Sequence, residues 1–525
     1  MIEFTTSTGA NAVSSVCQFF VRFASLIVWK LSCFDRVIFK GYLDISRVTP
    51  FEGWVDYVLG IRRMDYLKRD GKRLSNRLVG WAKTMAEREG RPYVFDRRVK
   101  EKDDWARRQL KESPITVGLI GILSTMESCP SYKLKPGQGR PQFYSTKIPQ
   151  LVLYYYFLDA GLGLIHVRVQ TWAPFTVQIY VNGHDYVARQ MARLGLGFEQ
   201  RDNAFVQLDD PRQAQKLADK FAKLSWPSIL NAYANKVNPL RRDVLKHDDY
   251  YWVTDQAEYA TDILFQSKSA LSGLFAKLLE FAWLTFSPKD VLGFLGRKLC
   301  GSFQGEVVTD VKTERDPGAR IKHRMKGNWL KMYDKFGLVV RIETVINQPG
   351  EFKIYRECTR MDGTRYWAWR PMPKGVGNLH HYQSHALACN QRYLQALSHV
   401  ADPTPAYREL ANLAEPKRVH GRNSAGFNPA QRNDLELFAA ILDGDHIAQG
   451  FRNKNLRRVL KLGTATGTIR RASAAVSRLL KRLHVRGLIA KVPRTRRWRV
   501  TNSGRQILSH TLTLYRRDWP NVNAA

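Results

Sequence analysis

Five consecutive strand-like runs between residues 319 and 371 constrain the fold of this chain more than any other feature. In these runs apolar and polar side chains alternate, which is the period of a strand with one buried face. The runs lie near 319–326, 329–335, 338–347, 352–360 and 364–371. Tight turns separate them, and Asp362-Gly363 is a pair typical of a β-hairpin. Because strands joined by such short turns pair antiparallel, the region predicts an antiparallel meander.

The charge of the chain is strongly basic and unevenly distributed. Its 525 residues carry a formal net charge of +36, with a pI of about 10.1. Such an excess usually meets a polyanion, and nucleic acid is the first candidate. Residues 452–517 alone hold 19 Lys or Arg and no Asp or Glu. This asymmetry indicates a nucleic-acid-binding module at the C-terminal end.

The order of elements in that basic region is typical of a winged helix-turn-helix. Helical patterns at 433–444, 450–460 and 471–489 precede two short strands and a further helix that starts near Asn502. The region resembles MarR-type domains, in which a strand, Thr-x-x-Gly and a helix follow the wing, here Val500 and Thr501 to Gly504. The expected nucleic-acid contacts are Arg457, Arg458, Arg471, Arg478, Lys481, Arg482, Arg494, Arg496, Arg497 and Arg499.

The chain is too long for one ordinary domain, so several are expected. We predict an α+β multidomain protein with antiparallel sheets, helices and a C-terminal winged helix-turn-helix. The predicted parts are an N-terminal strand and basic helical region at 1–112, an α+β domain at 113–249, a second α+β domain with the meander at 250–400, a linker at 401–429 and the winged helix at 430–525.

The segment WLKMYDKFGLVVRIETVIN, residues 329–347, is a candidate catalytic centre. Across its Phe-Gly turn, Asp334 and Glu343 can share one Mg²⁺ or Mn²⁺, because hard divalent ions prefer carboxylate oxygens. Such an ion supports phosphodiester chemistry. Lys331 is expected to act in catalysis by binding the scissile phosphate, and Tyr333 or Tyr355 is the expected nucleophile. Lys335 and Arg341 are expected to contact nucleic acid.

The same segment carries a resemblance. Tyr-Asp-Lys at 333–335 followed by Arg-x-Glu at 341–343 is similar to replication initiators of rolling-circle plasmids and phages. The resemblance implies a metal-supported tyrosine that nicks one DNA strand, in a protein of mobile-element or plasmid type. More broadly, 320–347, FLGRKL at 294–299, EYATDILF at 258–265 and VQTWAPFTVQIYVNG at 169–183 resemble a large family of uncharacterised bacterial proteins.

A non-catalytic alternative stays open. Alternating Lys, Arg and Glu across a hairpin are also typical of cross-strand ion pairs on a solvated face. The protein would then be a winged-helix transcriptional regulator or an RNA-binding scaffold. Glu258 and Asp262, four positions apart on a predicted strand, share one face and are either further metal ligands or buried, paired acids.

Two remaining patterns bear on the cellular compartment and on a candidate membrane segment. The six cysteines are scattered singly, so neither a zinc ribbon nor a disulfide framework is expected, and a reducing cytoplasm fits best. The apolar run 13–29 is short for a membrane span and contains Arg22, so a buried helix is expected there. The expected partner is nucleic acid, DNA rather than RNA, with no membrane, and the sequence identifies no protein partner.

Overall fold

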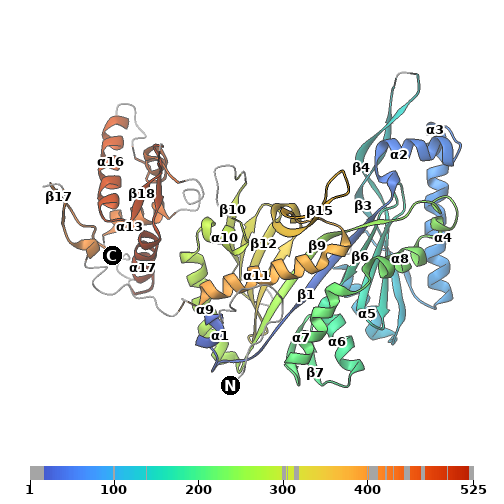
Figure 1. Cartoon of the computed structure of the whole chain (residues 1–525), viewed down its shortest axis with the longest axis horizontal. Coiled ribbons are helices and arrows are strands. Elements are labelled where there is room, and N and C mark those ends of the chain that lie inside the picture. The colour runs from blue at the N-terminus through green and yellow to red at the C-terminus, as the bar shows by residue number, and fades with distance from the viewer. Residues whose placement is uncertain are drawn as a thin grey trace. The chain divides into compact units, whose positions relative to one another are not determined.

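The computed structural model describes residues 17–97, 101–137, 139–297, 303, 305–312, 318–398, 400, 412–419, 422–429, 431–442, 450–462, 468–493 and 495–518. These residues form an α+β structure (Figure 1). The chain divides into two compact units. Unit 1 comprises Met1–Ile27, Phe265–Val340 and Gln391–Ala525, and unit 2 comprises Val28–Leu264 and Arg341–Asn390. Each unit therefore draws on ranges that the sequence pattern placed in several domains.

Unit 2 is built on a large mixed sheet with the strand order β13-β9-β1-β6-β5-β4-β3-β2. The strands are β1 (Ile27–Tyr42), β2 (Tyr93–Phe95), β3 (Gly118–Lys135), β4 (Gln142–Asp159), β5 (Gly163–Gln170), β6 (Val177–Val181), β9 (Tyr251–Phe265) and β13 (Val339–Ile346). β2 and β3 pair parallel, whereas the pairs from β3 through β4, β5 and β6 to β1 are antiparallel. The predicted α+β class is confirmed.

Helices cover one face of this sheet. They are α7 (Pro211–Lys220), α8 (Trp226–Val237) and α11 (Leu379–Leu397). α6 (Gly183–Arg193) follows β6, and its first turn reaches the opposite face, where His184 contacts Asp262. Trp226 of α8 packs on Phe39 of β1, and Asn390 of α11 bonds to Thr344 of β13 and to the backbone of Tyr259 in β9. Because side chains alternate along a strand, the opposite face of β9 and β13 holds Glu258, Asp262, Arg341 and Glu343.

Strand β1 departs from regular alternation next to this polar face. Phe34 packs on Tyr259 and Phe221, while Phe39 packs on Trp226, so both rings lie in the helical layer. Side chains five positions apart should lie on opposite faces of a regular strand. The pairing with β6 is regular from Val37 onward, so the irregularity falls at Asp35 and Arg36.

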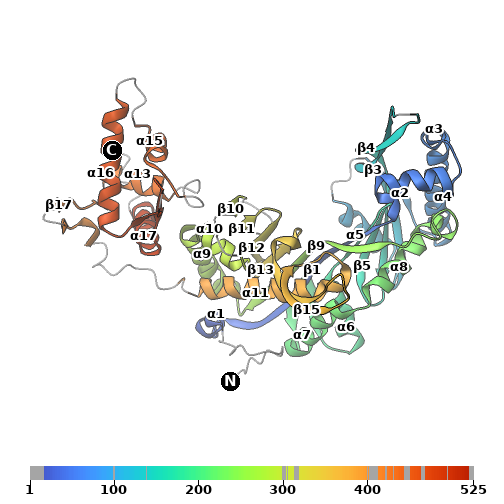
Figure 2. The ribbon, with the colours of Figure 1, turned by 45° about the horizontal axis from the view of Figure 1, so that its top comes forward.

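The far end of unit 2 is a helical cap on the long hairpin β3–β4. It consists of α2 (Val48–Gly53), α3 (Arg63–Asp65) and α4 (Gly71–Arg88), with α5 (Lys102–Glu112) packed on the sheet next to it. Figure 2 shows α2 beside the outer part of β3 and β4. The cap is held by aromatic contacts, such as Phe51 on Tyr132 with ring centroids 4.2 Å apart.

Two hairpins complete unit 2, β7 (Phe198–Arg201) with β8 (Ala204–Leu208), and β14 (Lys353–Thr359) with β15 (Arg365–Pro371). All five strands of the expected meander are present, close to their expected bounds. The meander is not continuous, however, because β14 and β15 form a two-stranded sheet of their own. Short connections indicate which strands follow one another, but they do not determine which strands share a sheet.

Unit 1 contains the three-stranded antiparallel order β10-β11-β12 and several helices. The elements before the C-terminal region are α1 (Gln18–Arg22), α9 (Lys268–Thr285), α10 (Pro288–Phe294), β10 (Val307–Lys312), β11 (Arg320–Met325) and β12 (Asn328–Lys335). Ser287 caps α10 in a capping box with Asp290. The run 13–29, expected to be one buried helix, divides into α1 and the start of β1, and its residues 13–16 lie outside the described residues.

The C-terminal region of unit 1 has its own apolar core. Its elements are β16 (Lys417–Val419), β17 (Arg422–Ser424), α13 (Arg432–Ile441), α15 (Asn453–Val459), α16 (Ile469–Val485), β18 (Ile489–Lys491), β19 (Trp498–Val500) and α17 (Asn502–Asp518). Phe438, Leu456 and Leu480 are among the residues buried between them. Thr501 Oγ1 accepts a hydrogen bond from the Gly504 amide, and a Cβ at Gly504 would lie 2.0 Å from the Leu488 carbonyl oxygen. Only glycine therefore fits where α17 begins.

Among the described residues no single helix is both long and apolar enough to cross a membrane. The pair α9 and α10, bent by 115°, passes the same test on length and composition when taken together.

Candidate functional site

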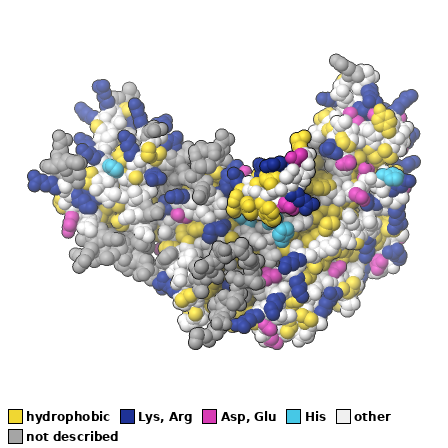
Figure 3. Space-filling model, in the orientation of Figure 1, with side chains coloured by type: hydrophobic (Ala, Val, Ile, Leu, Met, Phe, Trp, Pro, Cys, Tyr) yellow, Lys and Arg dark blue, Asp and Glu magenta, His cyan; other side chains and the backbone are white. Residues whose placement is uncertain are grey.

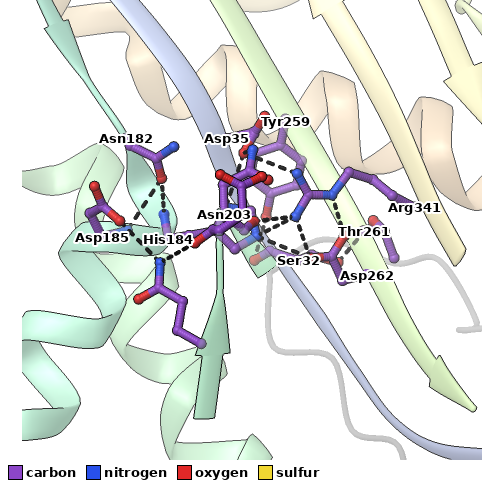
Figure 4. Close-up of polar contacts among 12 residues, drawn as sticks. Ser32, Asp35, Asn182, His184, Asp185, Asn203, Tyr259, Thr261, Asp262 and Arg341 are labelled. Carbon is purple, nitrogen blue, oxygen red and sulfur yellow. Dashed lines mark hydrogen bonds and ion pairs between the residues drawn. The ribbon is translucent and has the colours of Figure 1, made fainter. Parts of the chain in front are cut away.

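Arg341 of β13 is the centre of a buried polar network in unit 2 (Figure 4). Its side chain has no exposed surface. Nε and Nη2 donate to the two carboxylate oxygens of Asp262 at 2.6 and 2.7 Å, and Nη1 donates to Asp35 at 3.0 Å. Nη2 also donates to the carbonyl oxygen of Asn203 at 2.6 Å. A planar guanidinium with several donors suits this arrangement, because it can serve two carboxylates at once.

His184 at the start of α6 joins the same two carboxylates. Its Nε2 lies 3.0 Å from Asp262 and its Nδ1 lies 3.2 Å from Asp35. Burial opposes the charged form of the ring, but nearby Cys33 and the two carboxylates raise the pKa of His184 well above its ordinary value. Asn182 positions the ring, because its Oδ1 accepts the backbone amide of His184 and caps the helix.

Asp262 is held in its charged form, and Asp35 is held in place by several partners. Burial alone would raise the pKa of Asp262, yet Arg341 and His184 lower it to about 2. Asp35 is held by Arg341, by His184 and by the Asn203 side-chain amide, which donates to it at 2.6 Å. Removing one partner from such a network would leave a buried charge unpaired, so the network fixes the position of Asp35.

Next to this network three carboxylates converge. Asp35 of β1, Glu258 of β9 and Glu343 of β13 each offer an oxygen, and these oxygens lie within 4.8 Å of one another. All three residues are buried. Two ligand oxygens on opposite sides of one Mg²⁺ lie about 4.2 Å apart. Small side-chain rotations would therefore bring the three carboxylate oxygens close enough to bind one ion. Carboxylates from three strands are a donor set that fits Mg²⁺ or Mn²⁺.

The open face of the sheet continues from the acidic group onto β1, β6 and β5. Arg36 is exposed on this face, although neighbouring side chains cover part of its guanidinium. This partial burial opposes the charged form, but nearby acids, Glu258 above all, raise the pKa of Arg36 above its ordinary value. Its guanidinium lies 5.6 Å from the ring centroid of Tyr180, which stacks on His166 at 4.8 Å. Burial and the charge of Asp35 raise the pKa of Tyr180, so its phenol is protonated at neutral pH.

A hollow of about 480 Å³ lies on this face over β1, β3, β4, β5 and β6. Lys40 and Arg168 contribute cations to its lining, and Glu127 contributes an anion. Glu127 accepts from Lys102, Tyr154 and Arg168, and these donors lower its pKa to about 2 although burial opposes them. The polar lining is therefore pre-arranged by hydrogen bonds and ion pairs.

The candidate residues of the 329–347 segment lie on two strands, β12 and β13. Glu343 belongs to the acidic group, whereas Asp334 lies on β12 in unit 1, where it accepts the Gly337 amide at 3.0 Å. Lys331 and Tyr333 are half-buried on the same strand. Lys335 is buried, with Nζ 5.4 Å from the ring centroid of Phe336.

Two expectations for this segment need correction. Arg341 was expected to contact nucleic acid, but it is fully buried and its guanidinium is used by Asp262 and Asp35. The alternative of a solvated face is also wrong for β13, because every residue of that strand is buried. The expectation of a buried, paired acid is confirmed for Asp262. Tyr355, the second tyrosine considered, is exposed on β14.

The expected contacts of the C-terminal region lie on several elements. Arg471, Arg478 and Lys481 are exposed along α16, Arg458 is exposed on α15, and Arg496 and Arg499 are exposed at the hairpin β18–β19. Arg457 and Arg497 are half-buried, and Arg494 lies outside the described residues. Arg482 differs from the others, because its guanidinium donates to the carbonyl oxygen of Gly426 and lies 4.1 Å from the ring centroid of Phe427.

Asp35, His184 and Asn203 were not identified from the sequence. The signal for Asp35 was a charged residue inside an apolar strand, CFDRVIF, and the same signal occurs at Glu258, Asp262, Arg341 and Glu343. A charge inside an apolar strand is costly unless it is paired, so several such strands in one chain indicate a shared polar centre. His184 and Asn203 carry no comparable signal, because they lie at a helix start and in a turn.

Comparison of the chain with protein-family models, with curated proteins and with solved structures finds no match.

Proposed function

We propose that this protein binds DNA and cuts one of its strands with the help of a divalent ion held by Asp35, Glu258 and Glu343. The observation that carries the proposal is the convergence of these three buried carboxylates within 4.8 Å. They lie in a chain whose net charge of +36 favours a polyanionic substrate. Three carboxylate oxygens that converge in this way are a donor set that suits a hard divalent cation.

Bound Mg²⁺ or Mn²⁺ would polarise the scissile phosphate and stabilise the charge that develops on it. The chain's own residues prepare the site. Arg341 and His184 fix Asp35 through direct contacts. Arg36, exposed beside Glu258, is placed to hold a phosphate oxygen. In the reaction a P–O bond to the nucleophile replaces the P–O bond to the leaving sugar oxygen, which takes up a proton.

The nucleophile is either water or a tyrosine hydroxyl. The two tyrosines expected from the sequence are Tyr333 on β12 and Tyr355 on β14. A tyrosine nucleophile leaves the protein covalently joined to one DNA end, whereas water leaves two free ends. Electrophoresis of a labelled oligonucleotide under denaturing conditions separates the two products.

In this proposal the C-terminal region binds duplex DNA. The order α13, α15, α16, β18, β19, α17 supports a winged helix-turn-helix, with α16 as the helix that enters the major groove. Arg471, Arg478 and Lys481 are exposed on that helix and can meet phosphates. DNA is favoured over RNA because the major groove of A-form RNA is too narrow for a helix.

The test is the nicking of a supercoiled plasmid by the full-length protein with Mg²⁺ or Mn²⁺. We expect the wild type to convert the plasmid to open circles, and EDTA to stop the reaction. Glu258→Gln should lower the rate at least 100-fold while duplex binding is unchanged, because it removes one carboxylate ligand. Glu87→Gln is the matched control, since Glu87 is exposed on α4 in unit 2. If the wild type nicks with neither ion, the protein is a non-catalytic regulator or scaffold instead.

A further inference from the structure

The hairpin β14–β15 presents its aromatic residues on the side that faces solvent. In the antiparallel register Tyr355 lies opposite Trp369, and Glu357 lies opposite Trp367. Alternation therefore places the three aromatic residues on one face, together with Arg365. Every residue of that face is exposed, whereas Ile354 on the opposite face is buried. This is the reverse of the usual pattern, in which the aromatic face of a hairpin is the covered one.

The three rings form a continuous platform. Tyr355, Trp367 and Trp369 are 53, 59 and 66% exposed. The ring centroid of Tyr355 lies 5.5 Å from that of Trp367 and 5.8 Å from that of Trp369. Figure 3 shows hydrophobic side chains of this hairpin on the surface, next to lysines and arginines. Large apolar groups gathered in this way on a solvated surface indicate an interaction site.

Two cations share the face of the platform. Lys353 and Arg365 lie on it by the same alternation, beside Glu357. Arg370 and the Tyr366 hydroxyl to which it donates lie on the opposite face. Between residues 353 and 371 the hairpin carries five Lys or Arg against two Asp or Glu. An aromatic face on such a cationic hairpin is complementary to a polyanion with flat rings.

We propose that Tyr355, Trp367 and Trp369 bind single-stranded nucleic acid by stacking on its bases, while Lys353 and Arg365 on the same face hold its phosphates. In a duplex each base is already stacked between its neighbours, so only an unpaired strand offers free base faces. The inference rests on the proposed function, and it specifies a single-stranded segment as the form that unit 2 binds. It also assigns Tyr355 a role in stacking rather than in nucleophilic attack.

The experiment measures the affinity of the full-length protein for a fluorescein-labelled 20-nucleotide oligothymidylate and for a 20-base-pair duplex, both in EDTA so that no cleavage occurs. Trp367→Ala/Trp369→Ala should weaken binding of the single strand at least tenfold, since each lost stacking contact costs about that much. Binding of the duplex should change less than twofold. Trp367→Phe/Trp369→Phe should restore most of the affinity, because phenylalanine keeps a stacking face.

Trp283→Ala is the matched control, since Trp283 of α9 is 55% exposed and lies in unit 1. Unchanged single-strand affinity in the double alanine variant would overturn the proposal, as would equal weakening of single strand and duplex. A change of oligomeric state in light scattering, with single-strand affinity unchanged, would make the hairpin a protein-binding surface instead. Failure of nicking by the wild type bears only on the acidic group, so the two proposals fail separately.

Discussion

Arg341 is a fully buried arginine whose guanidinium connects strands that are distant in sequence. It bonds to Asp262 of β9 and Asp35 of β1, and its side chain has no exposed surface. A buried ion pair is costly to form, but breaking one by removing a partner is more costly still. The role of Arg341 is therefore to hold the carboxylates beside it in place, and the acidic group depends on it.

Arg341→Lys should lower the free energy of unfolding by about 3–5 kcal/mol, because lysine cannot serve Asp262 and Asp35 at once. Urea denaturation followed by circular dichroism measures the change. Arg365→Lys is the control, since Arg365 is 75% exposed and its pair with Glu357 is 3.9 Å long. That substitution should cost less than about 1 kcal/mol. Equal effects of the two substitutions would mean that the buried network contributes little to the free energy of unfolding.

At the residue scale the sequence predicted part of the site. Regular alternation along 338–347 correctly placed Arg341 and Glu343 on one face. Asp35 was not predicted, because it comes from a strand more than 300 positions away and from a point where alternation is interrupted. Asp334 was expected to share an ion with Glu343 because a turn joins their strands, whereas the carboxylates that the structure brings together with Glu343 are Asp35 and Glu258.

At the element scale the secondary structure followed closely from periodicity and turn residues. The five strands between 320 and 371, and the helices α13, α15, α16 and α17, lie near their expected bounds. These elements have clear apolar stripes or alternation, and both depend only on local spacing. Strand order could not be predicted in this way. β1 lies between β9 and β6, and such long-range pairings depend on burial across the whole sheet.

Helix α16 provides a prediction at this scale. Arg478→Ala/Lys481→Ala should reduce the slope of log affinity for duplex DNA against log salt concentration by about 2, since each phosphate contact contributes about 0.9. Titrations at several salt concentrations measure the slope. Arg482→Ala should leave the slope unchanged and lower stability, because its side chain is used by Gly426 and Phe427. An unchanged slope in the double variant would exclude α16 from the DNA interface.

At the scale of the whole molecule, charge and composition predict a partner but not a chemistry. The excess of cations, concentrated in residues 452–517, favours nucleic acid. The chain carries 47 Asp and Glu, and three of them meet in unit 2 from strands β1, β9 and β13. A count of charges cannot predict this convergence, because it depends on how the chain brings β1 beside β9. We therefore expect the acidic group to bind a divalent ion.

Isothermal titration of the full-length protein with Mn²⁺, in the absence of DNA, measures this binding. We predict one ion per chain for the wild type and at least tenfold weaker binding for Glu343→Gln, because a carboxylate ligand is lost. Asp334→Asn, in the same 329–347 segment, should bind Mn²⁺ as the wild type does, since Asp334 of β12 accepts the Gly337 amide. Wild-type affinity in folded Glu343→Gln, or loss of binding in Asp334→Asn, would show that the acidic group does not bind the ion.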